Sequence, residues 1–187
     1  MKLILKNLAS GLVVALGLAV VAPVSTLVAD QNQIPVPAQS EQLIQRQVVH
    51  ELRMLPYYSI FDNLNFRVEG NTVVLSGQVV NPVLKSDAGN VVKHVEGVQQ
   101  VVNNIQVLPL SNFDWQIRRA EERAIYRSPG FEKYYSALPP IHIIVDNGHV
   151  TLLGVVDSNL DKNMAGIRAN SVPGVFSVTN DLVVSRS

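Results

Sequence analysis

The segment VVLSGQV at residues 73–79 recurs as VTLLGVV at residues 150–156, and this repetition decides the fold. Sliding the chain by 77 positions places valine, leucine, glycine and valine of the first segment onto the same residues of the second. From residue 57 to residue 107 this offset gives 17 identities in 51 ungapped positions, about a third of the total. The chain therefore contains two homologous modules.

The alternation of apolar residues predicts a β-hairpin in each copy. Leu64, Phe66 and Val68 alternate with polar residues before a turn at Gly70 and Asn71. In the second copy, strand-like alternation lies on both sides of an Asn-Gly pair, which is the strongest short signal for a two-residue hairpin turn. Each module therefore contains a hairpin, with Leu75 and Leu152 at core positions.

Helical segments are predicted on both sides of each hairpin. Residues 43–55 and 115–127 precede the hairpins and end near prolines, while the spacing of Leu84, Ala88, Val91 and Val95 indicates a helix after the first hairpin. A third strand follows at residues 101–107 and 178–184. The resulting order, α-β-β-α-β, predicts an α+β fold of two tandem modules, each a three-stranded mixed sheet covered on one face by two helices.

This arrangement resembles the BON domain family, with V-x-L-x-G-x-V on the hairpin and G-V-x-x-V-x-N-x-(I/L)-x-V after the second helix. The first copy supplies Val73, Leu75, Gly77, Val79, Gly97, Val98, Val101, Asn103, Ile105 and Val107. The second copy supplies Val150, Leu152, Gly154, Val156, Gly174, Val175, Val178, Asn180, Leu182 and Val184. The resemblance implies a non-catalytic protein associated with phospholipid binding, envelope maintenance, osmotic or other envelope stress, or chaperone-like roles.

The beginning of the chain predicts export. Lys2 and Lys6 precede an uncharged stretch from Leu8 to Ala29, as in a secretory signal peptide, and we expect cleavage before Asp30. An uncleaved inner-membrane anchor is the alternative, because the stretch is long enough to span a bilayer. Residues 30–40 are then a linker, followed by modules at 41–108 and 111–187, and the expected location is the periplasm.

Charge and cysteine content exclude several classes of partner. Without Lys2 and Lys6 the 15 basic residues fall to 13 against 15 acidic ones, so the net charge is −2 and does not favour nucleic acid. There is no cysteine, so neither disulfides nor a lipoprotein attachment site is available. No small-molecule substrate is indicated by the sequence.

Sequence signals of catalysis are missing as well. The chain has no G-x-S-x-G motif and no cysteine nucleophile, so we expect neither an enzyme nor a cofactor. The expected hairpin pairing opposes His142 to Leu153 and His149 to Asp146. It sets the two histidines too far apart to share zinc and leaves only a weak ion site at His149 beside Asp146. Asn103 and Asn180 suit either a ligand contact or, as we favour, a side-chain amide that satisfies backbone groups.

Two sets of side chains are candidates for lipid or partner contact. Arg119, Arg123 and Arg127 recur every four residues with Arg118 alongside, and Phe113 and Trp115 lie at the start of the same helix. Glu121 and Glu122 dilute this basic stripe, which suits anionic lipid, although an ordinary solvated helix face explains it too. The other set consists of Tyr57, Tyr58, Tyr134 and Tyr135, which suit a membrane interface or plain packing.

Two functions remain open on this evidence. In the first, the protein contacts membrane phospholipid or envelope partners and supports the envelope under stress. In the second, it docks other proteins or assists their assembly in the periplasm without direct lipid binding. The absence of catalytic motifs and the repetition of one small module agree with both hypotheses.

Overall fold

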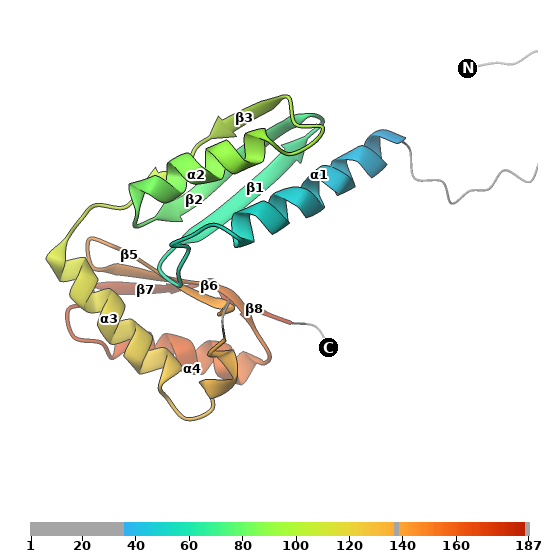
Figure 1. Ribbon diagram of the computed structural model, residues 1–187. Helices are drawn as coiled ribbons and strands as arrows, with labels where there is room; N and C mark the ends of the chain where they lie inside the picture. The colour runs from blue at the N-terminus through green and yellow to red at the C-terminus, as the bar shows by residue number, and fades with distance from the viewer. Residues whose placement is uncertain (1–35, 137–138, 186–187) are drawn as a thin grey trace, which may run out of the picture. The chain divides into compact units, whose positions relative to one another are not determined.

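The computed structural model describes residues 36–136 and 139–185, with side chains from Ser40 onward. Both modules belong to one compact unit, Ile34–Ser187 (Figure 1). The predicted signal segment, its cleavage site and most of the expected linker lie outside the described residues. The first helix begins at Val36, inside the segment expected to be a linker.

The first module has the predicted order, with its last strand in two pieces. Its elements are α1 (Val36–Arg53), β1 (Asn63–Glu69), β2 (Thr72–Val79), α2 (Pro82–Lys93), β3 (Gln100–Asn103) and β4 (Gln106–Val107). Strand β2 lies in the centre of the sheet, antiparallel to β1 and parallel to β3 and β4. Both helices cover one face of this sheet (Figure 1).

The second module repeats this topology. Its elements are α3 (Asn112–Tyr126), the 3-10 turn η1 (Glu132–Tyr134), β5 (Ile141–Asp146), β6 (His149–Val156), α4 (Asn159–Asn170), β7 (Ser177–Asn180) and β8 (Val183–Val184). Strand β6 pairs antiparallel with β5 and parallel with β7 and β8. The predicted α+β fold class, with two modules of mixed sheet and helices, is therefore confirmed.

The hairpin registers follow the 77-residue offset. Phe66 pairs with Leu75 in the first module, and Ile143 pairs with Leu152 in the second. Both leucines are fully buried, as expected from their core positions. Gly77 lies within its strand, because β2 continues to Val79. Gly77 has a φ of 116°, and a Cβ there would lie 2.0 Å from the Asn63 carbonyl oxygen, so only glycine fits.

The repeated asparagine interrupts the third strand for a structural reason. The Asn103 side chain donates to the Lys85 carbonyl of α2 at 2.7 Å and accepts from the Ile105 backbone N–H at 3.2 Å. Gly89 makes room for this amide, since a Cβ at that position would lie 2.8 Å from Asn103 Nδ2. Asn180 makes the same bond to the Lys162 carbonyl at 2.7 Å. The interpretation that the amide satisfies backbone groups is confirmed.

The first helices of the two modules follow a different offset. Glu41 of α1 accepts from the Gly70 backbone N–H, and Asp114 of α3 accepts from the Asn147 backbone N–H, both at 3.0 Å. The two hairpin residues are 77 positions apart, whereas the two carboxylates are 73 apart. The second copy therefore carries four extra residues between its first helix and its hairpin.

Packing confirms the 73-residue offset of the first helices. Ile44 of α1 lies against Gly97, and Ile117 of α3 lies against Gly174, which is the counterpart of Gly97. The buried series Ile44, Val48 and Leu52 then corresponds to Ile117, Glu121 and Ile125. A buried carboxyl thus replaces an aliphatic side chain at the middle position of the series.

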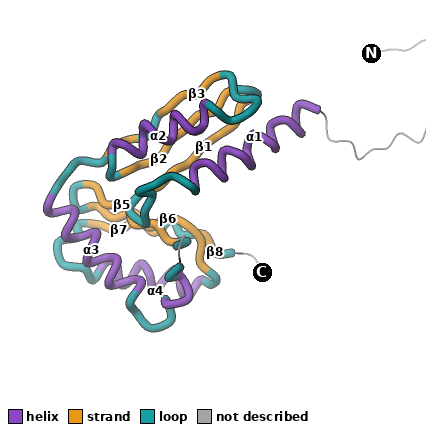
Figure 2. The backbone as a smooth tube through the Cα atoms, in the orientation of Figure 1, coloured by secondary structure: helices purple, strands orange, loops and turns teal. Residues whose placement is uncertain are grey.

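The modules contact each other through the loop between α1 and β1, drawn in teal in Figure 2. The Ile60 carbonyl accepts from the Ile143 backbone N–H of β5 at 2.7 Å. Phe61 is buried in the core of the second module, and its ring meets Trp115 edge-on at 5.9 Å between centroids. The first module therefore covers part of the free edge of β5, which would otherwise be open for pairing.

Truncation of either hairpin leucine tests this description. We expect Leu75→Ala and Leu152→Ala each to lower the free energy of unfolding by about 2 to 5 kcal/mol, since each leaves a cavity in a packed core. Leu110→Ala, at a residue 89% exposed, is the control and should change little. Urea unfolding followed by circular dichroism measures all three. Parent-like stability of both core variants would contradict the strand register.

Candidate functional site

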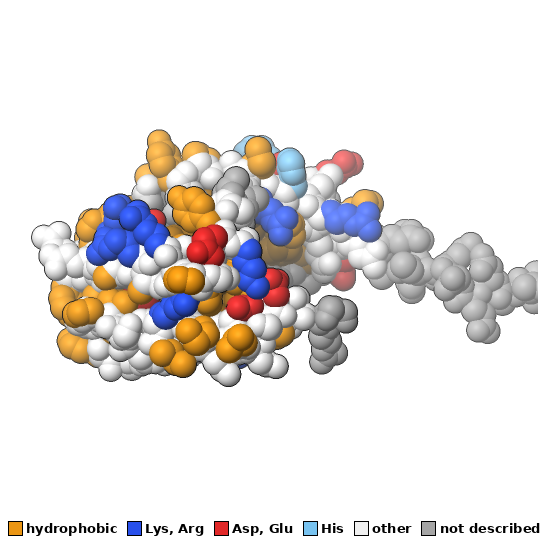
Figure 3. Space-filling model, turned by 90° about the horizontal axis from the view of Figure 1, so that it is seen from below, with side chains coloured by type: hydrophobic (Ala, Val, Ile, Leu, Met, Phe, Trp, Pro, Cys, Tyr) orange, Lys and Arg blue, Asp and Glu red, His pale blue; other side chains and the backbone are white. Residues whose placement is uncertain are grey.

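The predicted basic stripe is exposed on α3. Arg119, Arg123 and Arg127 all lie on the surface, and Trp115 at the start of the stripe is 47% exposed. Arg119 lies 3.8 Å from Glu122, which is a weak surface ion pair and leaves the arginine free to reorient. Figure 3 shows Lys and Arg side chains among hydrophobic ones on the face seen from below. The structure brings these four predicted residues together.

Arg118 does not belong to this surface. It is 1% exposed, and its Nη2 atom donates to the Val145 carbonyl at 2.6 Å. Burial lowers the pKa of Arg118, while the nearby carboxylates of Asp114, Asp62 and Asp146 oppose that change. Arg118 therefore ties α3 to the hairpin and cannot contact lipid in this structure, so its assignment to the contact surface was wrong.

Asp114 fixes the start of α3 against the hairpin turn. Its two carboxylate oxygens accept from the backbone N–H groups of Asn147 and Gly148, at 3.0 and 2.8 Å. Asn147 has a φ of 50°, as the predicted Asn-Gly turn requires. The N-terminal end of α3 is consequently held beside the turn, so the side chains at this end have defined positions.

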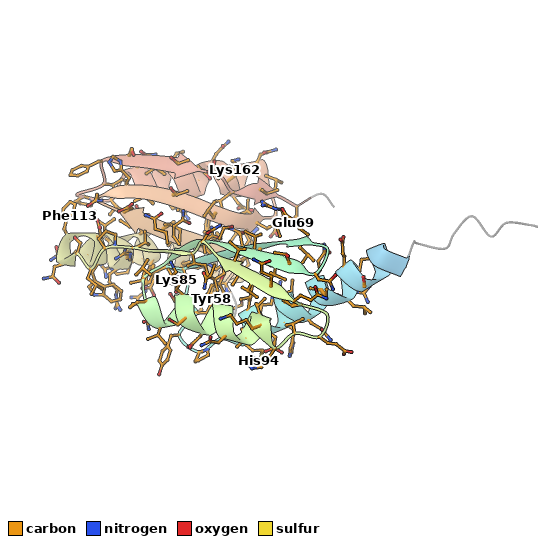
Figure 4. All side chains as sticks on the ribbon, turned by 90° about the horizontal axis from the view of Figure 1, so that it is seen from above. Tyr58, Glu69, Lys85, His94, Phe113 and Lys162 are labelled. Atoms are coloured by element: carbon orange, nitrogen blue, oxygen red, sulfur yellow. The ribbon has the colours of Figure 1, made fainter. Side chains whose placement is uncertain are left out.

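Exposed aromatic residues gather at this end of the second module. The rings of Phe113 and Phe176 lie 5.8 Å apart, and Phe176 is 69% exposed. Phe176 packs on the hairpin turn, where its backbone N–H donates to the Gly148 carbonyl at 2.9 Å. Figure 4 labels Phe113 near the start of α3, and Leu110 just before this helix is also exposed. Our sequence analysis named Phe113 beside Trp115, but it did not include Phe176 or Leu110.

The aromatic residues at this end are particular to the second module. With an offset of 73 on the first helix, Phe113 and Trp115 correspond to Ser40 and Gln42; with an offset of 77 on the loop, Phe176 corresponds to Gln99. Three aromatic side chains thus stand where the first module has polar ones. Comparing equivalent positions of the two modules identifies these aromatic side chains, but the comparison requires both offsets.

The four candidate tyrosines are spread over different environments. Tyr57 and Tyr135 are exposed, while Tyr134 is buried and donates from its hydroxyl to Asp161 at 2.9 Å. Tyr58 is half-buried and lies 5.6 Å from the His142 ring, beside a cavity of about 510 Å³ at the contact between the modules. The tyrosines therefore form no common surface, and Tyr134 has a structural role.

The histidines of the second hairpin do not form an ion site. The predicted pairing of His142 with Leu153 and of His149 with Asp146 is confirmed. The His149 Nδ1 atom lies 2.7 Å from the Ser177 hydroxyl, and Asp146 accepts from the Asn147 side chain. Within residues 36–136 and 139–185, no group of three metal-ligating side chains comes together.

Glu121 is an unusual core residue that the sequence analysis treated as a surface charge. It is 0% exposed, neither carboxylate oxygen has a hydrogen-bond partner among the described residues, and it occupies the place of Val48. Burial alone raises the pKa of Glu121 from 4.5 to about 7. Near neutral pH this carboxyl is therefore partly protonated in the folded chain.

A pH dependence of stability follows from Glu121. Below pH 4.5 the carboxyl is protonated in both the folded and the unfolded state, whereas between pH 4.5 and 7 only the unfolded state loses its proton. The free energy of unfolding should therefore fall by about 3 kcal/mol across this range and stay low above it. Urea unfolding at pH 5 and pH 8 measures the change.

Three variants isolate the contribution of this carboxyl. Glu121→Gln should remove its part of the pH dependence, and Glu121→Val, which copies the first module, should raise stability at pH 8. Glu122→Gln is the matched control, because Glu122 is the neighbouring residue and reaches the surface. A pH dependence of the same size in parent and Glu121→Gln would rule out Glu121 as its source.

Comparison with known proteins identifies a family and little beyond it. The family model described as "BON domain" matches residues 40–109 and 128–186. No curated protein matches the chain. Two solved structures of CdsD, a structural protein of the type III secretion system of Chlamydia trachomatis, are similar at 14% identity and a TM-score of 0.33. The match to one structure covers 75% of this chain and 96% of the CdsD chain, and the match to the other covers 77% of this chain and 93% of the CdsD chain. Among the described helices, none is long and apolar enough to cross a membrane.

Proposed function

This chain belongs to the BON domain family, and from that premise we propose that it is an exported, non-catalytic envelope protein that binds anionic phospholipid. The contact is made by the second module, through the basic stripe of Trp115, Arg119, Arg123 and Arg127 and the aromatic end of Phe113 and Phe176. The observation that carries the proposal is the presence of exposed aromatic side chains where the first module has polar residues.

Exposed aromatic groups beside arginines suit a membrane interface. An apolar side chain gains roughly 1.5 to 3 kcal/mol when it is fully removed from water, so Phe113 and Phe176 favour contact with a less polar phase. Trp115 combines an apolar body with a polar N–H group and suits the headgroup region. The second module thus offers both apolar and polar contacts on neighbouring surfaces.

The arginines supply the preference for negative charge. Each basic residue close to an anionic membrane surface contributes about 1 kcal/mol. Arg119, Arg123 and Arg127 follow Trp115 at intervals of four residues and therefore lie on one side of α3. In the first module the equivalent positions carry Arg46, His50 and Met54, which gives that helix a weaker basic character.

Export and a role in the stressed envelope complete the proposal. The supporting feature for export is the predicted signal segment, residues 1–29, and the supporting feature for the envelope is the family. Phospholipid contact would place the protein at a periplasmic membrane surface. Support of envelope integrity under osmotic or other stress is the corresponding physiological role.

Protein docking remains the second candidate function. It is favoured by an open groove on the first module, which is separate from the aromatic end and the basic stripe. In that case the chain recruits or assembles other envelope proteins, with or without lipid contact. Vesicle binding separates the two candidates.

Neutralising the stripe tests lipid contact. We expect Arg119→Gln, Arg123→Gln and Arg127→Gln together to weaken binding of residues 30–187 to anionic vesicles at least tenfold, since three contributions of about 1 kcal/mol are lost. Added salt should weaken parent binding as well, because the attraction decays within about 10 Å at 0.1 M ionic strength. Flotation with phosphatidylglycerol-containing and purely zwitterionic vesicles measures both effects.

The matched control removes the same charge from the first module. Arg46→Gln, Arg53→Gln and Arg67→Gln should leave vesicle binding near that of the parent. Stability should survive in both triple variants, since exposed ion pairs contribute less than about 1 kcal/mol each. Equal binding of the two triple variants would reject the stripe as a lipid contact and favour protein docking.

A further inference from the structure

An open groove runs along the first module between α1 and the free edge of β1. It encloses about 600 Å³, and its lining includes Gln42, Gln45 and Arg46 from α1 together with Phe66 and Arg67 from β1. Helix α1 lies alongside β1 in Figure 1. Among the described residues β1 pairs with β2 alone, so one side of the strand has no strand partner.

The corresponding groove of the second module follows from the two offsets. Gln42, Gln45 and Arg46 correspond to Trp115, Arg118 and Arg119 on α3, 73 residues later. Phe66 and Arg67 correspond to Ile143 and Ile144 on β5, 77 residues later. The same surface therefore exists twice in the chain.

In the second module this groove is occupied by the segment Ser59–Asp62. Phe61 meets Trp115, the Ile60 carbonyl accepts from the Ile143 N–H, and Asp62 lies close enough to Arg118 to favour its charged form. The aliphatic and aromatic residues thus contact the strand edge and the helix, while the acidic residue closes the turn through Ser59 and lies near Arg118. The chain itself shows what kind of polypeptide this surface accepts.

We propose that the groove of the first module binds a turn of a partner protein, with an aliphatic, an aromatic and an acidic residue in succession, because Ser59–Asp62 is itself a turn in which the Asp62 N–H donates to the Ser59 carbonyl at 3.2 Å. The segment lies beside β1 as Ser59–Asp62 lies beside β5. This interaction surface is independent of the lipid contact, because it uses the other module.

The strand edge supplies the main-chain part of the contact. Phe66 has the same place in its hairpin as Ile143, whose backbone N–H donates outward to Ile60. The Phe66 N–H is therefore directed to the open side of β1. Addition of a polypeptide to a free sheet edge provides backbone hydrogen bonds, and the pockets beside the edge provide side-chain selectivity.

The charge of the groove selects the acidic residue. Arg46 and Arg67 are both exposed on its lining, while Glu69 pairs with Arg67 at 2.5 Å. One guanidinium is thus paired within the module, and the other is available to a carboxylate of the partner. Exposed charges of this kind steer and orient an incoming segment more than they raise its affinity.

A second copy of the chain is a poorer occupant than a different protein. Its own Ser59–Asp62 segment is already used within the chain. The equivalent segment of the second module begins at Ser136 and carries Pro139 in place of Asp62, and its residues Ala137 and Leu138 lie outside the described structure. Pro139 has no carboxylate, so this segment cannot reproduce the contact that Asp62 makes.

A peptide with the sequence of residues 57–63, acetylated at its N-terminus, is the probe. We expect it to bind residues 30–187 saturably in calorimetry and to shift the NMR amide signals of α1 and β1. Gln42→Trp with Gln45→Arg copies the occupied groove and should tighten binding at least fivefold. Arg46→Glu with Arg67→Glu should weaken it at least fivefold.

Two controls make the result specific. Arg123→Glu with Arg127→Glu reverses the same charge outside the groove and should leave the peptide affinity unchanged. A peptide with Ile60→Ser and Phe61→Ser should not bind. Circular dichroism of every variant, matching the parent, shows that a lost affinity does not reflect unfolding.

Each other outcome overturns the proposal in a definite way. Equal peptide affinity of the parent and all groove variants, no peptide binding, or shifts confined to α3 and β5 would each reject the groove as the site. Concentration-dependent self-association that Arg46→Glu with Arg67→Glu abolishes, without peptide binding, would assign the groove to a second copy. Vesicle binding is measured separately, so failure of either proposal leaves the other standing.

Discussion

The contact between the modules depends on one carboxylate, that of Asp62. One of its oxygens accepts from the Val80 backbone N–H at 2.8 Å, and the other accepts from the backbone N–H and the hydroxyl of Ser59. These bonds close the loop and hold Ile60 and Phe61 toward the second module. Asp62 is 1% exposed, and its burial is tolerated because both oxygens are satisfied. Without this carboxylate, the loop would have no fixed shape with which to cover the edge of β5.

The sequence predicted those parts of the fold whose contacts are repeated within each module. Gly89 and Asn103 are identical in the two copies because the amide reaches the Lys85 backbone carbonyl past a residue without a side chain. Gly77 and its counterpart Gly154 are identical because each has a positive φ beside a carbonyl oxygen. Such local constraints act equally on both copies, so an ungapped comparison reveals them, and the topology follows.

The first helices could not be aligned from the sequence, because no comparable constraint marks their register. Four extra residues in the second copy shift α3 by about one helical turn, which preserves its buried face and hides the insertion. On that face Arg118 and Glu121 occupy positions that apolar periodicity would assign to aliphatic residues. We therefore predicted both as surface charges, and the resulting candidate site included Arg118 while missing Phe176. The sequence predicted those site residues that recur every four positions on the exposed side of α3, namely Trp115, Arg119, Arg123 and Arg127.

Within the described residues, a loop fills the groove of the second module, and the groove of the first module is open. The loop of the first module fills the groove of the second, but no preceding module exists in the described chain to fill the groove of the first. A free strand edge is normally protected by charge or by a covering segment, because it can pair with other chains. Here Arg67 and Glu69 lie on β1, whereas the equivalent positions of β5 carry Ile144 and Asp146. The exposed edge thus bears an ion pair that resists indiscriminate pairing, while the apolar lining beside it, including Phe66, still offers contacts to a segment of matching chemistry.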